Sequence, residues 1–267
     1  MTQKKALIVI SFGSTFDETR SRDIGGIEQA LAAAFPAYDQ YRAFTSGVIR
    51  KRLAQRGIMV DDTETVLKKL QAEGYEEVIL QPTHLLHGEE FEQKVLALKE
   101  TFAPSFRHIV IGKPLIFSDD DFFLVAAAMA ARLPSFAPGE GAVFMGHGTP
   151  RNNNKAFCHT YAKLQSVFDS MQLPVVIGTV EEDDRPNFGD VLEQLKKRGY
   201  TKVHMYPLMV VAGDHANNDM YGDDEDSWKN RIEALGIATE GHLCGMGRCK
   251  AVQALYIHHM LQSLAGR

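Results

Sequence analysis

A gapless internal repeat constrains the fold of this chain more than any other feature of its sequence. The stretch "VLKKLQAEGYEEVILQPTHLLHGEE" (66–90) aligns with "VLEQLKKRGYTKVHMYPLMVVAGDH" (191–215), and eight of the first 23 aligned positions are identical: Val, Leu, Leu, the Gly-Tyr pair, Val, Pro and Gly. A looser match places "SFGST" (11–15) over "GHGTP" (146–150). Because each copy joins a helical pattern to an apolar run, the repeat predicts two α/β halves of similar topology.

Short apolar runs alternate with amphipathic segments along both halves. Strands are expected at "ALIVISF", "EEVILQP", "HIVIGKP", "AVFMGHG", "VVIGTVE" and "KVHMYPLMVV". This alternation predicts a mainly parallel sheet flanked by helices in each lobe. The Pro- and Gly-rich stretch "LPSFAPGEG" (133–141) marks the expected boundary, with an N-terminal lobe at 1–135 and a C-terminal lobe at 136–267 whose terminal helix is free to pack back on the first lobe. Two facing lobes are expected to leave a cleft for a ligand.

Composition excludes several classes of protein. A net charge of -5 argues against a nucleic-acid-binding protein, and the apolar runs are much shorter than the roughly 20 residues of a membrane helix. The run at 6–10 is followed by no small-residue cleavage site, so we interpret it as a strand rather than a signal peptide. The three cysteines (Cys158, Cys244 and Cys249) form no CxxC pair, which favours a reducing cytoplasm.

Candidate functional side chains lie where the predicted strands end, which is where sites form in open α/β sheets. His147, Glu181 and His215 follow strands of the second half, and Glu90 is the counterpart of His215 in the first. The first half carries Phe12 where the second carries His147. Two imidazoles and a carboxylate suit a divalent first-row metal ion. A histidine after a strand is more often a capping or core residue. The residues alone therefore allow two interpretations, a metal site or structural histidines.

Other charged or metal-binding residue types have simpler interpretations. The acidic run "DDED" (223–226) is expected in the first turn of the helix that carries Trp228. The spacing in "GHLCGMGRC" (241–249) fits no zinc template, so we interpret it as a loop, and His258 and His259 are expected to be solvated. No nucleotide-binding or nucleophile-elbow motif occurs.

Several long motifs resemble one known family. "ALIVISFGST", "RAFTSG", "FMGHGTP", "GTVE", "PLMVVAGDHANNDM" and "DDEDSWK" look like the anaerobic cobalt chelatases of cobalamin biosynthesis, the CbiK-type sirohydrochlorin cobaltochelatases, over residues 4–262. These class II chelatases share a two-lobed fold with protoporphyrin ferrochelatase. The resemblance implies that Co²⁺ is bound as a substrate and inserted into the tetrapyrrole sirohydrochlorin with release of two protons, without a nucleotide. A homo-oligomer is compatible with the sequence.

The resemblance also implies roles for individual residues. His147, Glu181 and His215 correspond to the metal ligands, and His147 to the catalytic residue that accepts pyrrole protons. Glu90 corresponds to a further catalytic acidic residue near the metal. An imidazole suits both roles, because it titrates near neutral pH and binds metals in its neutral form.

The carboxylates of the substrate are expected to accept hydrogen bonds from the protein. Substrate contacts are expected from two loops: Ser11, Phe12, Gly13, Ser14, Thr15, Thr45 and Ser46. Thr45 and Ser46 precede a predicted helix, whose first backbone N–H groups favour anions. Phe12 is expected to stack on the flat macrocycle.

Three other functions remain as alternatives. A metal or tetrapyrrole carrier would use the same ligands without turnover, and a sirohydrochlorin ferrochelatase would make sirohaem with iron. A metallohydrolase would be expected to carry a tighter, more carboxylate-rich site. Affinities in a His/carboxylate site follow the Irving–Williams order, so the ligand types alone do not select cobalt.

Overall fold

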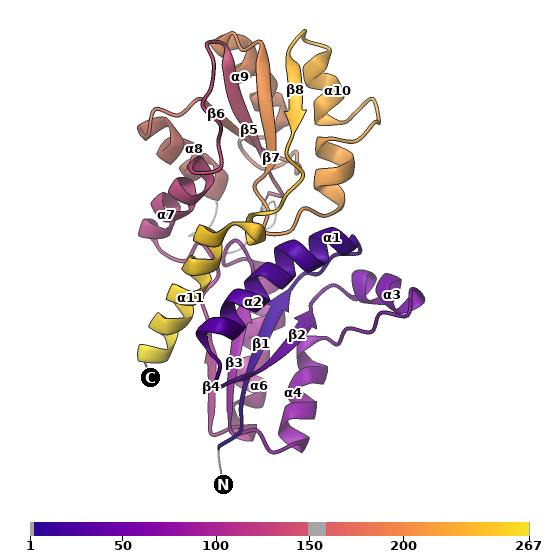
Figure 1. Ribbon diagram of the computed structural model, residues 1–267, viewed down its shortest axis with the longest axis vertical. Helices are drawn as coiled ribbons and strands as arrows, with labels where there is room; N and C mark the ends of the chain where they lie inside the picture. The colour runs from indigo at the N-terminus through magenta and orange to yellow at the C-terminus, as the bar shows by residue number, and fades with distance from the viewer. Residues whose placement is uncertain (1–2, 149–158, 267) are drawn as a thin grey trace. The chain divides into compact units, whose positions relative to one another are not determined.

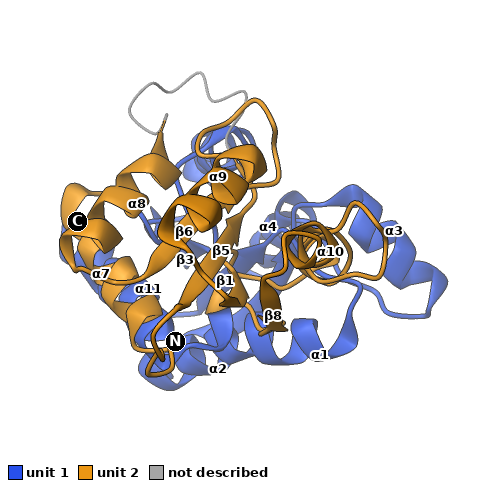
Figure 2. Ribbon diagram, turned by 90° about the horizontal axis from the view of Figure 1, so that it is seen from above, with its two compact units in different colours: residues 1–117, 247–267 blue, residues 118–246 orange. Residues whose placement is uncertain are grey.

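The computed structural model describes residues 3–148 and 159–266 and contains two compact units (Figures 1 and 2). The first unit comprises residues 1–117 and 247–267, and the second comprises residues 118–246. This division differs from the boundary expected at 135/136. Helix α7 (Asp119–Ala130) belongs to the second unit, where it packs against α8 (Thr160–Ser170). Helix α11 (Lys250–Ala265) belongs to the first unit, where it packs against α2 (Gly25–Ala34).

The first unit contains a four-stranded parallel sheet in the order β2-β1-β3-β4. Its strands are β1 (Lys5–Ser11), β2 (Asp39–Phe44), β3 (Glu77–Pro82) and β4 (His108–Ile111). Besides α2 and α11, its helices and helical turns are α1 (Asp17–Thr19), η1 (Arg20–Ile24), α3 (Gly47–Gln55), α4 (Thr63–Ala72), α5 (Glu89–Phe91), η2 (Glu92–Leu96), α6 (Ala97–Phe102), η3 (Ala103–Ser105) and η6 (Met246–Arg248, which begins at the last residue of the second unit).

The second unit repeats this topology with a parallel sheet in the order β6-β5-β7-β8. Its strands are β5 (Glu140–Gly146), β6 (Val175–Thr179), β7 (Lys202–Pro207) and β8 (Ala238–Gly241). Besides α7 and α8, its helices are α9 (Phe188–Arg198), α10 (Trp228–Glu233) and the π-helical turn η5 (Ala216–Met220). The identical strand order confirms the prediction of two similar α/β lobes, each with a parallel sheet and flanking helices.

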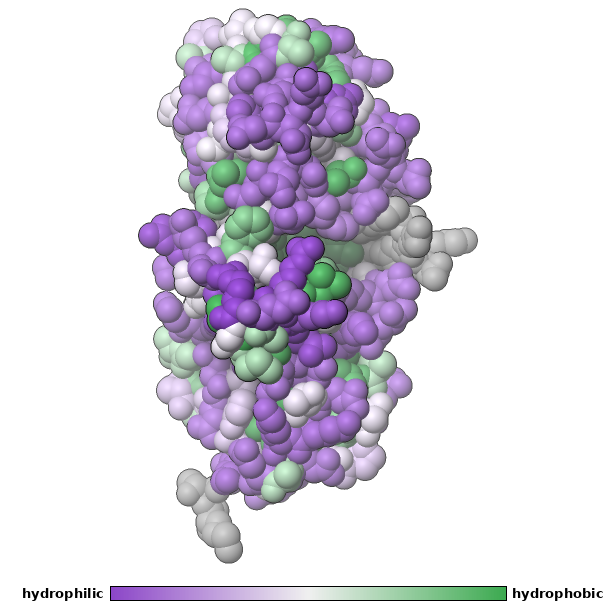
Figure 3. Space-filling view, turned by 90° about the vertical axis from the view of Figure 1, so that its right-hand side faces the viewer, coloured by the Kyte–Doolittle hydropathy of each residue, from purple (hydrophilic) through white to green (hydrophobic). Residues whose placement is uncertain are grey.

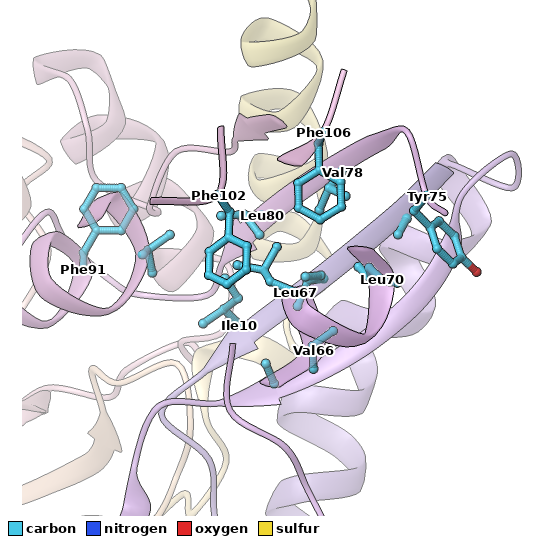
Figure 4. Close-up of a cluster of buried hydrophobic side chains, with 14 residues drawn as sticks. Ile10, Val66, Leu67, Leu70, Tyr75, Val78, Leu80, Phe91, Phe102 and Phe106 are labelled. Atoms are coloured by element: carbon cyan, nitrogen blue, oxygen red, sulfur yellow. The ribbon is translucent and has the colours of Figure 1, made fainter. Parts of the chain in front are cut away.

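The apolar runs form strands because they are buried on both faces of their sheets. Residues 6–10 of β1 are at most 1% exposed, which is typical of a central parallel strand covered by helices. On one face of this sheet, Leu67 and Leu70 of α4 pack against Val78 and Leu80 of β3 (Figure 4). The side chain of Asp62 caps the start of α4 by accepting a hydrogen bond from the backbone N–H of Thr65.

The core of the second unit is built around an aromatic pair. Phe188 and Trp228 stack with their ring centroids 4.4 Å apart, on one side of the sheet formed by β5, β6 and β7. Ser227 caps α10, which begins at Trp228. The acidic run at 223–226 therefore precedes this helix and does not form its first turn as expected, because the capping serine intervenes.

The two histidines of the terminal helix have different environments. His258 is exposed as expected, whereas His259 is buried and its Nδ1 lies 2.9 Å from the carbonyl oxygen of Pro114. The expectation that His259 is solvated is wrong, because one face of α11 packs against the first unit. The stretch 241–249 consists mostly of loop, as predicted, and ends in η6.

Hydrophilic side chains dominate the face drawn in Figure 3, where apolar residues occur in small separate groups. In the described part of the chain, no helix combines the length and the apolar character needed to cross a bilayer.

Candidate functional site

The three candidate metal ligands follow three adjacent strands of the second unit. His147 comes directly after β5, Glu181 follows β6, and His215 lies after β7, at the start of the helical segment that continues as η5. Since the sheet order is β6-β5-β7, the strand that carries His147 is the central one of the three. The carboxyl ends of adjacent parallel strands lie at one edge of the sheet, which is the usual place for a site in an α/β fold.

The two histidines lie beside each other at this edge. The ring centroids of His147 and His215 are 4.9 Å apart, and the ring planes are nearly perpendicular at 82°. The backbone N–H of Glu181 donates a hydrogen bond to the carbonyl oxygen of His147 at 3.1 Å. Gly148 has a φ of +108°, and a Cβ at this position would lie 2.7 Å from the Cβ of Glu181. Position 148, next to His147, therefore requires a glycine, because any larger residue would clash with the Glu181 side chain.

The candidate ligand atoms of His147, Glu181 and His215 do not all lie within 4.8 Å of one another. In residues 3–148 and 159–266, three potential ligands that do meet this distance belong to another part of the second unit. Neutral imidazoles and a carboxylate can close around an ion by rotating about their side-chain bonds. The assignment of Glu181 as the third ligand stays a prediction.

His215 is oriented by a neighbouring carboxylate. Its Nδ1 lies 2.5 Å from Oδ2 of Asp219, one helical turn further along η5. This contact leaves Nε2 available for a metal ion, as in the carboxylate–histidine–metal arrangements common in metalloproteins. Asp219 was not among the predicted site residues, although the i,i+4 spacing from His215 in "HANND" signals the contact.

Replacing Asp219 with asparagine is expected to raise the apparent KM for the metal ion by about 10- to 100-fold. The neutral amide no longer increases the basicity of Nε2, and its N–H can donate to Nδ1 and stabilise the tautomer whose Nε2 carries the proton. The measurement is the rate of metal insertion as a function of metal concentration. Asp223→Asn is the matched control, because this exposed carboxylate contacts Lys229 and no histidine. An equal effect of both substitutions would mean that only net charge matters.

The corresponding glycine of the first unit also has a positive φ. Gly13 has a φ of +101°, and a Cβ there would lie 2.7 Å from the ring of Phe44. Phe12 is 53% exposed, so its ring is available to a flat ligand. The hydroxyls of Ser11 and Ser14 are buried and accept hydrogen bonds from the backbone of this loop. These two serines therefore hold the loop in shape, and their direct contact with a substrate stays a prediction.

The remaining predicted substrate residues hydrogen-bond with other residues of the first unit. The guanidinium of Arg56 donates to the carbonyl oxygen of Thr15 at 2.5 Å, and Ser46 caps α3 by accepting from the backbone N–H of Ile49. Thr45 donates a hydrogen bond from Oγ1 to Oε1 of Glu90 at 2.5 Å.

Glu90 lies in α5 of the first unit, beside a histidine that was not singled out from the sequence. Nε2 of His84 lies 3.8 Å from Oε2 of Glu90. The His84 side chain is only 12% exposed, and neither ring nitrogen has a hydrogen-bond partner in the described residues. Burial lowers the pKa of His84, although the nearby Glu90 carboxylate opposes the shift. The pair is a candidate for proton transfer, and the "THLLHGEE" context offered no signal for it.

Acidification is expected to destabilise the first unit through His84. The pKa of His84 is about 6.5 in the unfolded chain and lower in the folded protein. Below about pH 6.5 the unfolded state therefore binds more protons than the folded state, and the free energy of unfolding decreases as the pH falls. Urea unfolding midpoints between pH 7.5 and 5.5 should therefore fall less steeply in His84→Gln than in the parent. His258→Gln, at an exposed position of the same unit, should keep the parental slope. An unchanged slope in His84→Gln would contradict this origin of the pH dependence.

Comparison with known proteins identifies the family. The model of the cobalt chelatase family CbiK matches residues 5–265. The chain belongs to the CbiK family of cobalt chelatases. It is 40% identical over 262 residues to the sirohydrochlorin cobaltochelatase of Salmonella typhimurium, covering 98% of this chain and 97% of that protein. It is 29% identical over 264 residues to the sirohydrochlorin cobaltochelatase CbiKC of Nitratidesulfovibrio vulgaris, covering 98% and 91%. Membership in the CbiK family makes the chain a metal chelatase.

Solved structures agree with the two-lobed fold. SirB from Bacillus subtilis with Fe³⁺ superposes with a TM-score of 0.65 at 16% identity, covering 99% of this chain and 97% of that one. The CbiK family assignment and this fold confirm the resemblance inferred from the sequence motifs.

Proposed function

We propose that this CbiK-family chelatase inserts Co²⁺ into sirohydrochlorin during anaerobic cobalamin biosynthesis, with His147, Glu181 and His215 as the ligands of the incoming ion. The observation that carries the proposal is the pair of imidazoles, 4.9 Å apart between ring centroids, at adjacent strand ends of a chain in this family. The names of its relatives in Salmonella and Nitratidesulfovibrio support the choice of substrate.

The ligand set suits an ion that must be held and then released. Two imidazoles and one carboxylate leave coordination positions open, and the macrocycle nitrogens fill them as water leaves the ion. His215 binds through Nε2, because its Nδ1 is engaged with Asp219. The ion moves from protein ligands to macrocycle nitrogens in steps, so it is never stripped of all ligands at once.

The reaction must also remove two protons. Sirohydrochlorin loses two pyrrole N–H protons as four Co–N bonds form, and the charge of the ion replaces that of the protons. His147 accepts a proton from the macrocycle as it gives up the ion, since an imidazole that has lost its metal is free to take up a proton near neutral pH. Glu90, hydrogen-bonded to Thr45 and 3.8 Å from His84, is the proposed relay for the second proton.

Residues of the first unit are proposed to contact the macrocycle. The exposed ring of Phe12 offers a flat apolar surface, and the positive φ of Gly13 exposes backbone to a close approach. The reaction uses no nucleotide. We place it in the cytoplasm, because the three cysteines form no CxxC pair, which favours a reducing compartment.

The test is a visible-absorption assay in which a small amount of enzyme meets excess sirohydrochlorin under anaerobic conditions, with Co²⁺, Fe²⁺ or Ni²⁺ in parallel. Many turnovers are expected with Co²⁺ and two protons released per ion inserted, without added nucleotide. At most one spectral change per chain would identify a carrier. Faster turnover with Fe²⁺ than with Co²⁺ would identify a sirohaem-forming ferrochelatase instead.

A further inference from the structure

A second group of metal-binding residue types lies on the sheet of the second unit. In the parallel pairing of β7 with β8, His204 is in register with Glu240. His242 follows Glu240 by two residues and therefore lies on the same face of the sheet. His204 is distant in the sequence from Glu240 and His242, and it meets them because of this register.

The potential ligand atoms form a small triangle. Nδ1 of His204 lies 3.1 Å from Nε2 of His242 and 3.7 Å from Oε2 of Glu240, and Nε2 of His242 lies 3.6 Å from Oε1 of Glu240. Metal–nitrogen bonds of about 2.0–2.1 Å in a tetrahedral site place neighbouring ligand atoms about 3.3 Å apart. Each of the three distances lies within about 0.4 Å of this spacing. The two histidines approach different oxygens of Glu240, so the carboxylate must rotate to offer one oxygen to a shared ion.

Packing holds both imidazoles in place. His204 is buried and its ring lies 5.7 Å from that of Phe136, centroid to centroid. His242 stacks on Tyr206, with ring centroids 4.2 Å apart and planes inclined by only 3°. Glu240 is about half exposed, so an ion can reach the triangle from solvent on this side. Such support reduces the entropy lost when a ligand set closes around an ion.

A charged neighbour holds one oxygen of the Glu240 carboxylate. The ammonium of Lys202 lies 2.7 Å from Oε2 of Glu240, so the two groups form an ion pair. Oε1 of Glu240 is the oxygen that lies 3.6 Å from Nε2 of His242. Oε2 of Glu140 lies 4.0 Å from Nε2 of His204, the ring nitrogen that is not part of the triangle.

This triangle is separate from the site of the insertion reaction. His204 pairs in register with Ala142, near the start of β5, whereas His147 comes after the end of that strand. Five residues of extended chain span about 16 Å. The triangle therefore lies toward the end of the sheet opposite His147 and His215, and one ion cannot serve both.

We propose that His204, Glu240 and His242 form a second site, which binds one divalent first-row transition ion independently of the insertion site. Two imidazoles and a carboxylate are a ligand set typical of such ions. The spacing within "GHLCGMGRC" does not predict this group, because that stretch contains only His242, whereas Glu240 and the distant His204 lie outside it.

The test measures Co²⁺ bound per chain by equilibrium dialysis of tag-free protein near pH 7.5, together with the visible absorption of the bound ion. The background is the full chain with His147→Ala and His215→Ala, which removes two proposed ligands of the insertion site. We expect one bound Co²⁺ per chain in this background. Adding His242→Gln should abolish binding, and adding Glu240→Gln should weaken it at least about tenfold, because the amide lacks the ligand charge.

His258→Gln is the matched control, since it removes an exposed histidine of α11 and should leave one ion bound. Glu240→Gln changes a half-exposed side chain without changing its shape, so it keeps the test valid if His242→Gln impairs folding. Failure of the background protein to bind Co²⁺, or undiminished binding with Glu240→Gln, would overturn the proposal. Because the insertion site is disabled throughout, neither result depends on the proposed enzymatic function.

Discussion

Replacing His147 with alanine is expected to lower kcat/KM for cobalt insertion by at least about a hundredfold. The substitution removes a proposed ligand at the end of the central strand and also the group proposed to accept a pyrrole proton. Loss of general base catalysis alone typically costs 10²- to 10⁴-fold. The measurement is the initial rate of the visible spectral change with sirohydrochlorin and Co²⁺ under anaerobic conditions.

Binding of the macrocycle should survive His147→Ala, because the proposed macrocycle contacts, such as Phe12, lie in the other unit. Quenching of protein fluorescence by sirohydrochlorin without metal measures this binding separately. His258→Ala is the matched control and should insert cobalt at the parental rate. Parental activity in His147→Ala would show that His147 takes no part in the mechanism. Equal losses of binding and activity would show that its role is structural.

Replacing Leu80 with alanine is expected to destabilise the first unit by about 2–5 kcal/mol, the usual cost of truncating a fully buried leucine. Leu80 is 0% exposed in the middle of β3, paired in register with Ile8 on one side and Ile111 on the other. Figure 4 shows it in the cluster with Phe102 and Leu67. Since whole domains are stable by only about 5–15 kcal/mol, the loss is a large fraction of the total.

Urea unfolding followed by circular dichroism measures this change. Leu261→Ala is the matched control, because Leu261 is 52% exposed on α11 of the same unit and its truncation should change stability by no more than about 0.5 kcal/mol. A loss below about 1 kcal/mol in Leu80→Ala would mean that the cavity collapses or that β3 contributes little to this unit's core.

Features that depend on local pattern were predicted well. The apolar runs at β1, β3, β5 and β7 form strands where expected, and the repeat corresponds to two sheets of identical strand order. Burial on both faces leaves a clear mark on such strands, because nearly every side chain must be apolar. Gly13 after β1 and Gly148 after β5, which the looser match aligns, both have a positive φ.

The candidate site was predicted in part. His147 and His215 lie together because strand ends of a parallel sheet meet at one edge, which topology makes predictable. The contact of Asp219 with His215 was readable from helical spacing but was missed. The pairing of His84 with Glu90 depends on how the loop after β3 folds back on itself, and no spacing rule signals it.

The sequence by itself determined six of the eight strands in the described residues, their duplication, the family and the strand ends that carry the candidate ligands, because these follow from periodicity and from motifs contiguous in the chain. The edge strands β2 and β8 were not predicted, because their residues are less apolar and less buried. Only the tertiary structure decided which side chains meet across the fold. It buried His259 under the packing of α11, and it joined His204 to Glu240 and His242 through the register of β7 and β8. Such contacts arise from packing and strand register between distant segments, which local sequence pattern does not encode.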